Sequence, residues 1–334
     1  MNLRPLAPVA LLLAAFAAPA VAQDTLQARN EAMFREMQSE RGLGAREIEA
    51  IRGIFARSGF IGQGNPAVTR HAMSREECAA RAPGGGAGYA NRQFERICGA
   101  KYMAPLYDPA TQRPEDATSC IDQFEYPNIP CAYPVVWVKA VEAAQICAAE
   151  GKRLCDAHEW EGACAGALKP PDYRFDLARG AGASGAVSRM RQAHNNQYAA
   201  TQSWAYGPNF QRGVCAQNSE KSATCPGGGW RNCGSNTYPT GAFPGCTSPL
   251  QVYDLHGNAA EHMNLPLAPD QMASAGSTKL GVTEMKGSWF IWDKYRAHPD
   301  WCRWRAPYWH GDRVMSPASH ENYHLGFRCC SSIN

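Results

Sequence analysis

The sequence contains no C-x-x-C pair, no long apolar run after its first residues and no large excess of charge of either sign. The absence of C-x-x-C argues against zinc ribbons and thioredoxin-like redox chemistry. Because no run of about 18 apolar residues follows the first 22, we expect no membrane span in the mature chain. A formal net charge of +3 over 334 residues gives no reason to expect nucleic acid as a partner.

Residues 1–22 have the pattern of a secretory signal peptide. Arg4 precedes an apolar stretch, and residues 20–22 (AVA) form a small-residue cleavage site before Gln23. No Arg-Arg pair occurs in this segment, which favours the general export route. We therefore expect a periplasmic or secreted protein.

All 14 cysteines follow the predicted cleavage site. An even number of cysteines in an exported chain predicts disulfides, because that compartment is oxidising. The pairing does not follow from the sequence. Cys329 and Cys330 are adjacent, and we expect each to bond elsewhere rather than to its neighbour.

Residues 25–59 have apolar side chains at helical spacing, and Gly42 and Gly44 interrupt the pattern, which predicts a helical hairpin. A glycine-rich loop follows at 81–92, with no G-K-[ST] sequence that would make it a phosphate site. We expect residues 23–99 to be an N-terminal extension packed on a main domain of residues 100–334.

Residues 135–166 predict two helices. The first should have one face of Val138, Val141, Ala144, Ala148 and their neighbours and end at Gly151. Asp156 and Glu159 fit a capping box that opens the second. After residue 167 the chain is rich in Gly, Pro, Ser, Asn and Cys, which predicts a long irregular region held by disulfides.

The segment HENYH (320–324) matches the H-E-x-x-H pattern of zinc proteases, which requires both histidines on one helical face. Pro317 and Gly326 flank it closely, and none of the last ten residues is His, Asp or Glu. We interpret it as a loop.

In DLHGNAAEH (254–262), carboxylates and backbone carbonyls lie close together in the sequence. They could bind calcium, or form a turn without an ion.

Residues 286–312 combine five tryptophans with arginines, histidines and Cys302. Such aromatic and arginine side chains can form a binding surface or a packed core. Arg303 and Arg305 would favour the thiolate of Cys302 if it were free, whereas a disulfide would make it inert.

Six segments, in order, resemble the sulfatase-modifying-factor family, whose best-known member is the formylglycine-generating enzyme. They are CIDQFEYPN (120–128), PVVWVKAVEAAQICAAEGKRLCDAHEWEGACAG (134–166), VYDLHGNAAEHM (252–263), KGSW (286–289), CRWRAP (302–307) and HLGFRCC (324–330). The resemblance covers about residues 100–334. It implies an α+β fold related to C-type lectins, loop-rich with little regular secondary structure and stabilised here by disulfides.

The resemblance also implies bound metals. The calcium ligands of the family match Asp254, Gly257, Ala259 and Glu261, the middle two through their carbonyls. The family enzyme oxidises a cysteine of unfolded sulfatases with oxygen and a copper(I) ion held by two cysteines. The first of these is three residues after Ser288, where this chain has Ile291, and Cys302 is the match for the second. One thiol cannot form the two-cysteine copper site.

These observations leave three hypotheses. The first is an oxidoreductase acting on a peptide or protein, with Cys302 and Ser288 catalytic and His262, His298 or His310 completing a copper or iron site. The second is a non-catalytic, calcium-containing module that binds a peptide, glycan or partner protein. Its expected cleft residues are Trp289, Trp301, Arg303, Trp304 and Arg305. The third, a true formylglycine-generating enzyme, is the least favoured because of Ile291. A free Cys302 would favour the first, and a disulfide the second.

Overall fold

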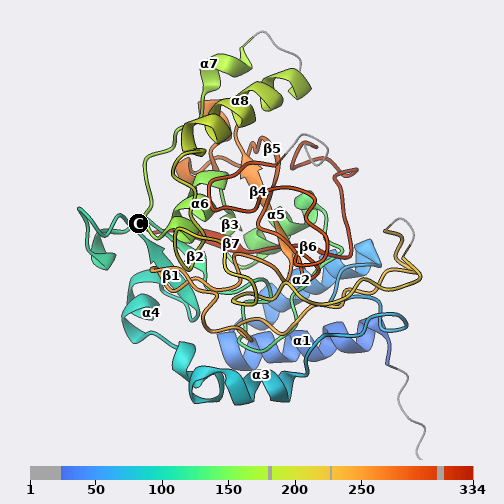
Figure 1. Ribbon diagram of the computed structural model, residues 1–334. Coiled ribbons are helices and arrows are strands. Elements are labelled where there is room, and N and C mark those ends of the chain that lie inside the picture. Colours follow the sequence, from blue (N-terminus) through green and yellow to red (C-terminus); the bar gives the residue numbers. More distant parts are fainter. Residues whose placement is uncertain (1–23, 180–182, 226–227, 307–311, 334) are drawn as a thin grey trace, which may run out of the picture.

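The computed structural model describes residues 24–179, 183–225, 228–306 and 312–333 (Figure 1). The predicted signal peptide and His310 therefore lie outside the described residues. Within them, no helix is both long and apolar enough to span a membrane.

Two small sheets form the centre of the chain (Figure 1). The first has the order β1-β2-β7-β3 and is antiparallel throughout. Its strands are β1 (Met103–Leu106), β2 (Ser119–Asp122), β7 (Cys329–Ser332) and β3 (Arg153–Leu154). In the second, β4 pairs antiparallel with β5 and parallel with β6. Its strands are β4 (Ala260–Leu265), β5 (Val282–Lys286) and β6 (Leu325–Phe327).

Helices cover these sheets and make up the N-terminal part of the chain. The α-helices are α1 (Leu26–Arg41), α2 (Ala45–Ser58), α3 (Arg75–Arg81), α4 (Arg92–Cys98), α5 (Ala140–Ala149), α6 (Ala157–Ala165), α7 (Phe175–Ala178) and α8 (Ala183–Tyr198). Short 3₁₀ helices are η1 (Pro83–Tyr89), η2 (Pro114–Asp116), η3 (Pro269–Gln271) and η4 (Ala273–Ala275). The mixture of helices and small sheets, with long irregular connections, is the predicted α+β class.

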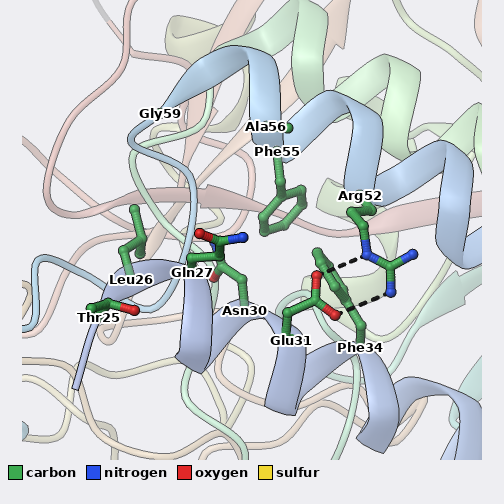
Figure 2. Close-up of a pocket in the computed structure, with 10 residues that line it drawn as sticks. All are labelled: Thr25, Leu26, Gln27, Asn30, Glu31, Phe34, Arg52, Phe55, Ala56 and Gly59. Carbon is green, nitrogen blue, oxygen red and sulfur yellow. Dashed lines mark hydrogen bonds and ion pairs between the residues drawn. The ribbon is translucent and has the colours of Figure 1, made fainter. Parts of the chain in front are cut away.

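The predicted hairpin is present as α1 and α2. Gly42 ends α1 with φ +75°, a left-handed conformation that suits glycine. Phe34 and Phe55 pack edge to face at 5.1 Å between ring centroids. Both belong to one buried cluster with Ile146 of α5 and Phe327 of β6, so the hairpin shares its core with the sheets. A groove of about 490 Å³ lies between the two helices, beside the Glu31–Arg52 ion pair (Figure 2).

The prediction for the helix after residue 135 was wrong in its buried face. α5 begins at Ala140 and ends at Ala149, and the cap residue Glu150 is followed by Gly151 with φ +70°, so the predicted end of the helix at Gly151 is confirmed. Its buried residues are Ala140, Ala143, Ile146 and Cys147. The reason is that Val138 lies ahead of the helix, so the helical face starts from a different residue. The second helix, α6, does open with the predicted Asp156–Glu159 capping box.

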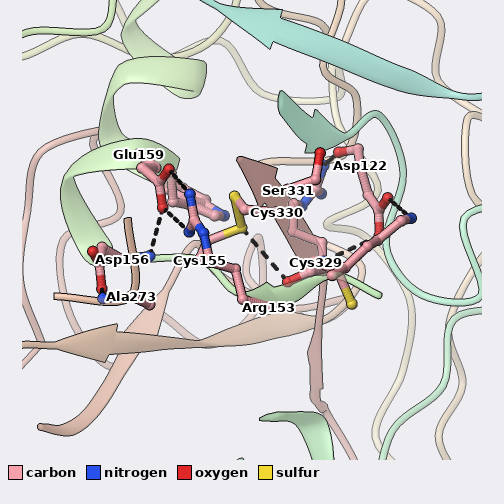
Figure 3. Close-up of a disulfide and its surroundings, with 12 residues drawn as sticks. Asp122, Arg153, Cys155, Asp156, Glu159, Ala273, Cys329, Cys330 and Ser331 are labelled. Atoms are coloured by element: carbon pink, nitrogen blue, oxygen red, sulfur yellow. Dashed lines mark hydrogen bonds and ion pairs between the residues drawn. A yellow bond between two sulfur atoms is a disulfide. The ribbon is translucent and has the colours of Figure 1, made fainter. Parts of the chain in front are cut away.

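All 14 cysteines are paired in seven disulfides. Cys329 bonds to Cys147 of α5, and Cys330 bonds to Cys155 beside β3 (Figure 3). The expectation that these neighbours bond elsewhere is confirmed. The other pairs are 78–131, 98–120, 164–302, 215–246 and 225–233.

Candidate functional site

Ser288 is at the centre of a buried hydrogen-bond network. Its hydroxyl accepts hydrogen bonds from the backbone N–H of Gly257 at 2.9 Å and from the Gln217 side chain at 2.9 Å. It donates to Asp300 at 2.9 Å. Ser288 is fully buried, so this network joins the predicted calcium loop to the tryptophan-rich segment.

Asp300 is held as a carboxylate by several donors. Besides Ser288, the indole N–H of Trp204 donates to its other oxygen at 2.9 Å. Burial by itself would raise the pKa of Asp300, but His256, Trp204 and Ser288 together hold that pKa below its usual value. Nδ1 of His256 lies 3.7 Å from the carboxylate.

Cys302 lies beside the same histidine, bonded to Cys164 of α6. Nε2 of His256 is 3.3 Å from the Cys164 sulfur and 3.9 Å from the Cys302 sulfur, and accepts a hydrogen bond from the Ala205 N–H at 3.0 Å. Both cysteines and His256 are fully buried. The copper(I) site that the family resemblance implies uses two thiolates, and this pair offers none while oxidised, so the residues do not fit that site in this state.

The histidines expected to assist Cys302 have other neighbours. Nε2 of His262 lies 3.0 Å from the carbonyl oxygen of Val138. The ring of His298 stacks on Trp304 at 4.5 Å. Sequence reasoning missed His256, Gln217 and Asp300, because only the fold brings these separate segments together. No motif marked Cys164 as the partner of Cys302.

The residues expected to form the cleft have different environments. Trp289, Trp301 and Arg305 are buried, whereas Arg303 and Trp304 are half-buried. Ile291, at the position of the missing copper ligand, is also buried. Much of the tryptophan-rich segment is therefore core.

Arg305 belongs to a buried ion cluster. Its Nε donates to Glu161 at 2.9 Å, and Nζ of Lys286 donates to the same oxygen at 2.6 Å. Burial would raise the pKa of Glu161, but the two cations hold it well below its usual value. His194 and Asp172 extend the cluster, with 3.2 Å between Nδ1 and a carboxylate oxygen. The cluster ties α6, α8, β5 and residues 303–305 together.

Around the predicted calcium loop, buried carboxylates outnumber buried cations among the described residues. Asp254, Glu125 and Glu261 are all buried, and Arg328 is the guanidinium that faces them. Glu261 accepts two hydrogen bonds from Arg328, at 2.6 and 2.7 Å, and one from Trp160 at 2.9 Å. Burial raises the pKa of Asp254 to about 7.

One oxygen of this loop has no partner among the described residues. Oδ2 of Asp254 accepts from the Gly241 N–H at 2.5 Å, whereas Oδ1 is buried without a hydrogen bond. A hard cation would use such an oxygen, and would balance the excess of negative charge. The residues present thus fit calcium at Asp254, while Glu261 is largely engaged by Arg328.

Potential metal ligands gather in two groups among the described residues: Cys164 with His256 and Cys302, and Glu161 with Asp172 and His194. HENYH belongs to neither group. Residues 320–324 form no helix, and His324 stacks on Trp289 at 4.7 Å. The geometry of a zinc protease is therefore not formed.

The fold and site define a class: an α+β domain in which disulfides hold irregular segments around a buried polar network. The sulfatase-modifying factor enzyme 1-like domain model matches residues 89–333. The chain belongs to this family, as the ordered segments predicted. No curated protein gives a significant match.

Two solved structures are similar to parts of the chain. "Crystal Structure of CarF" has 14% sequence identity and a TM-score of 0.28, covering 60% of this chain and 68% of that one. "Major Tropism Determinant I1 Variant" has 11% identity and a TM-score of 0.30, covering 70% and 55%. At such TM-scores neither likeness bears on function.

Proposed function

We propose that this chain is an exported, non-catalytic member of the family that binds a peptide or partner protein. The observation that carries the proposal is the disulfide between Cys302 and Cys164. The family chemistry requires two thiolates on copper, and here the matching segment has Ile291 and a half-cystine. A buried disulfide next to a fully buried hydrogen-bonded network supports a structural use of this segment.

The binding surface in this proposal is formed by the exposed Arg296 and the half-buried Arg303 of the segment. The guanidinium of Arg303 lies over the Tyr198 ring at 5.0 Å, and that of Arg296 lies over Phe210 at 4.2 Å. No carboxylate pairs with either arginine in the part of the chain that the structure describes. Stacked, unpaired guanidinium groups favour carboxylates on a ligand, so we expect an acidic peptide.

The proposal includes calcium at Asp254, supported by its buried oxygen Oδ1, which has no partner among the described residues. Asp254 would hold the ion through that oxygen, with the carbonyls of Gly257 and Ala259 as further ligands. Calcium would supply charge neutralisation and rigidity to the loop that supports Ser288.

The test combines thiol mapping, peptide oxidation and binding. Alkylation of the native protein should label no cysteine, and a Cys-x-Pro-x-Arg peptide should gain no aldehyde by mass spectrometry. A fluorescent acidic peptide should bind, and Arg296→Ala/Arg303→Ala should weaken binding by about tenfold or more. Lys279→Ala, in an exposed ion pair, is the control. Aldehyde formation, or a free thiol at Cys302, would overturn the proposal.

A second candidate is the metal-dependent oxidoreductase. The observation that favours it is the close group of Cys164, Cys302 and His256, which reduction would convert into two thiols beside an imidazole. Reduced protein should then take up stoichiometric copper(I) in competition with a chelator, and His256→Ala should lower its affinity. If reduction unfolds the chain without copper uptake, this candidate is excluded.

A further inference from the structure

A second pocket, away from the candidate site, has features of a ligand site. It has a volume of about 570 Å³, within the usual range for small-molecule sites. Residues of its wall come from the segment after β1, from the start of α6, from residues 168–171 and from the end of the chain. It shares no lining residue with the network around Ser288.

The charged groups of this pocket are already paired. Nζ of Lys169 lies 2.5 Å from the Asp108 carboxylate. Glu159 accepts hydrogen bonds from both terminal nitrogens of Arg153, at 2.6 and 2.7 Å (Figure 3). Each of these carboxylates is paired with its own cation. The described residues of the pocket therefore leave no unpaired charge for an anionic or a cationic ligand. A neutral ligand is favoured.

His158 supplies a polar ring atom. The hydroxyl of Tyr173 accepts a hydrogen bond from the His158 backbone N–H at 3.0 Å and lies 2.9 Å from Nδ1 of the ring. This contact engages Nδ1 and leaves Nε2 for a ligand hydroxyl, which can both donate and accept. His158 is only 6% exposed, lines the pocket, and makes no hydrogen bond through Nε2 among the described residues.

Hydroxyl groups supply both donors and acceptors. Ser332 accepts from Nε of Arg153 at 3.2 Å and keeps its own proton to donate. Ser274 donates to Asp156 at 2.6 Å and keeps lone pairs to accept. Thr111, Thr118 and Ser119 add further hydroxyls to the wall. Leu168, Pro170 and Pro171 add apolar surface to the wall.

We propose that this pocket binds a neutral sugar. Each sugar hydroxyl both donates and accepts, as the serine and threonine hydroxyls of this pocket do, and the carbon face of the ring can pack on the prolines. No cation among the described residues of the pocket wall is left unpaired for a phosphate or another anion, and an apolar ligand would leave the hydroxyls of the wall without partners. The site does not depend on the proposed peptide-binding function.

The test uses the full exported chain and saturation-transfer NMR with glucose, galactose, mannose and N-acetylglucosamine, with glucuronate as the charged comparison. At least one neutral sugar should bind with a Kd of about 1 mM or tighter, and glucuronate more weakly. Thr118→Trp, at an exposed position, should fill the pocket and abolish binding. His158→Phe should weaken it by about tenfold, through loss of one hydrogen bond.

Ala56→Trp is the matched control, because it places the same side chain in the α1–α2 groove. Its sugar affinity should equal that of the unmodified chain. Failure of all four sugars to bind would overturn the proposal. So would binding that survives Thr118→Trp, or a preference for glucuronate.

Discussion

The sulfur of Cys302 is bonded to that of Cys164, a residue 138 positions earlier in the chain. The bond joins α6 to the segment that follows Ser288, with His256 packed against both sulfurs. It makes a half-cystine of the residue that the sequence marked as the candidate thiol. The stability of the fold and the absence of thiol chemistry should therefore depend on the same bond.

Removal of this disulfide should destabilise the chain strongly. Because the Cys155–Cys330 bond already joins the flanking segments, the Cys164–Cys302 bond closes a loop of about 40 residues, and the lost entropy of the unfolded chain is worth roughly 4 kcal/mol. The Cys225–Cys233 bond, with a separation of 8, gives roughly 2.5 kcal/mol in the same treatment. The free energy of unfolding, measured with denaturant, should therefore be lower for Cys164→Ala/Cys302→Ala than for Cys225→Ala/Cys233→Ala. The reverse order would show that this entropy does not dominate.

Lys286→Met should cost about 3–5 kcal/mol, because it leaves the Glu161 carboxylate buried with a partner missing. Lys279→Met removes an ion pair of similar length, 2.6 Å, whose two side chains are 70% and 61% exposed. That change should cost less than about 1 kcal/mol. Unfolding free energies from urea titration compare the two, and equal losses would argue against a structural role for the buried cluster.

Acid should destabilise the chain through His262. Burial lowers the pKa of this histidine to about 4, against 6.5 for an ordinary histidine. Between these values the unfolded chain binds a proton that the folded chain does not, so stability falls as the pH falls from 6.5 to 4. The contribution is on the order of 3 kcal/mol.

His262→Gln keeps an N–H donor for the Val138 carbonyl but does not titrate in this range. Its unfolding free energy, measured by denaturant at several pH values, should have a smaller slope across this window. An unchanged slope would assign the acid sensitivity to other groups.

Chelation should lower the Tm if calcium binds at Asp254. Addition of EDTA should lower the Tm of the unmodified chain, and calcium in excess should restore it. Asp254→Asn removes the charge but keeps the side-chain shape, so its Tm should respond little to EDTA. Elemental analysis of the purified protein provides the second measurement. Purified protein that contains no calcium, and whose Tm is the same with and without EDTA, would contradict the prediction.

Local sequence patterns were sufficient for several elements of the fold. Helical spacing with Gly42 at its break specified the α1–α2 hairpin, since these signals act within a few residues. The capping box of Asp156 and Glu159 specified the start of α6 for the same reason. Ordered segments spread over most of the chain specified the family.

Local patterns failed where a distant contact decides the outcome. The buried face of α5 depends on where the preceding extended segment ends, and Val138 alone does not indicate that point. The tryptophan-rich segment could equally be surface or core, and only its packing buries Trp289 and Trp301. The amino-acid composition of this segment is the same whether its tryptophans are exposed or buried, so composition alone does not distinguish the two.

The sequence by itself determined the family, the α+β class, an even set of cysteines and the absence of a cysteine at position 291. Only the tertiary structure decided which cysteines pair, that His256 and Asp300 meet at Ser288, and that hydroxyls from distant segments line one pocket. The physical reason is that helix spacing and caps are encoded between neighbours. Disulfides, buried ion pairs and pockets instead depend on contacts that form only when the whole chain is packed.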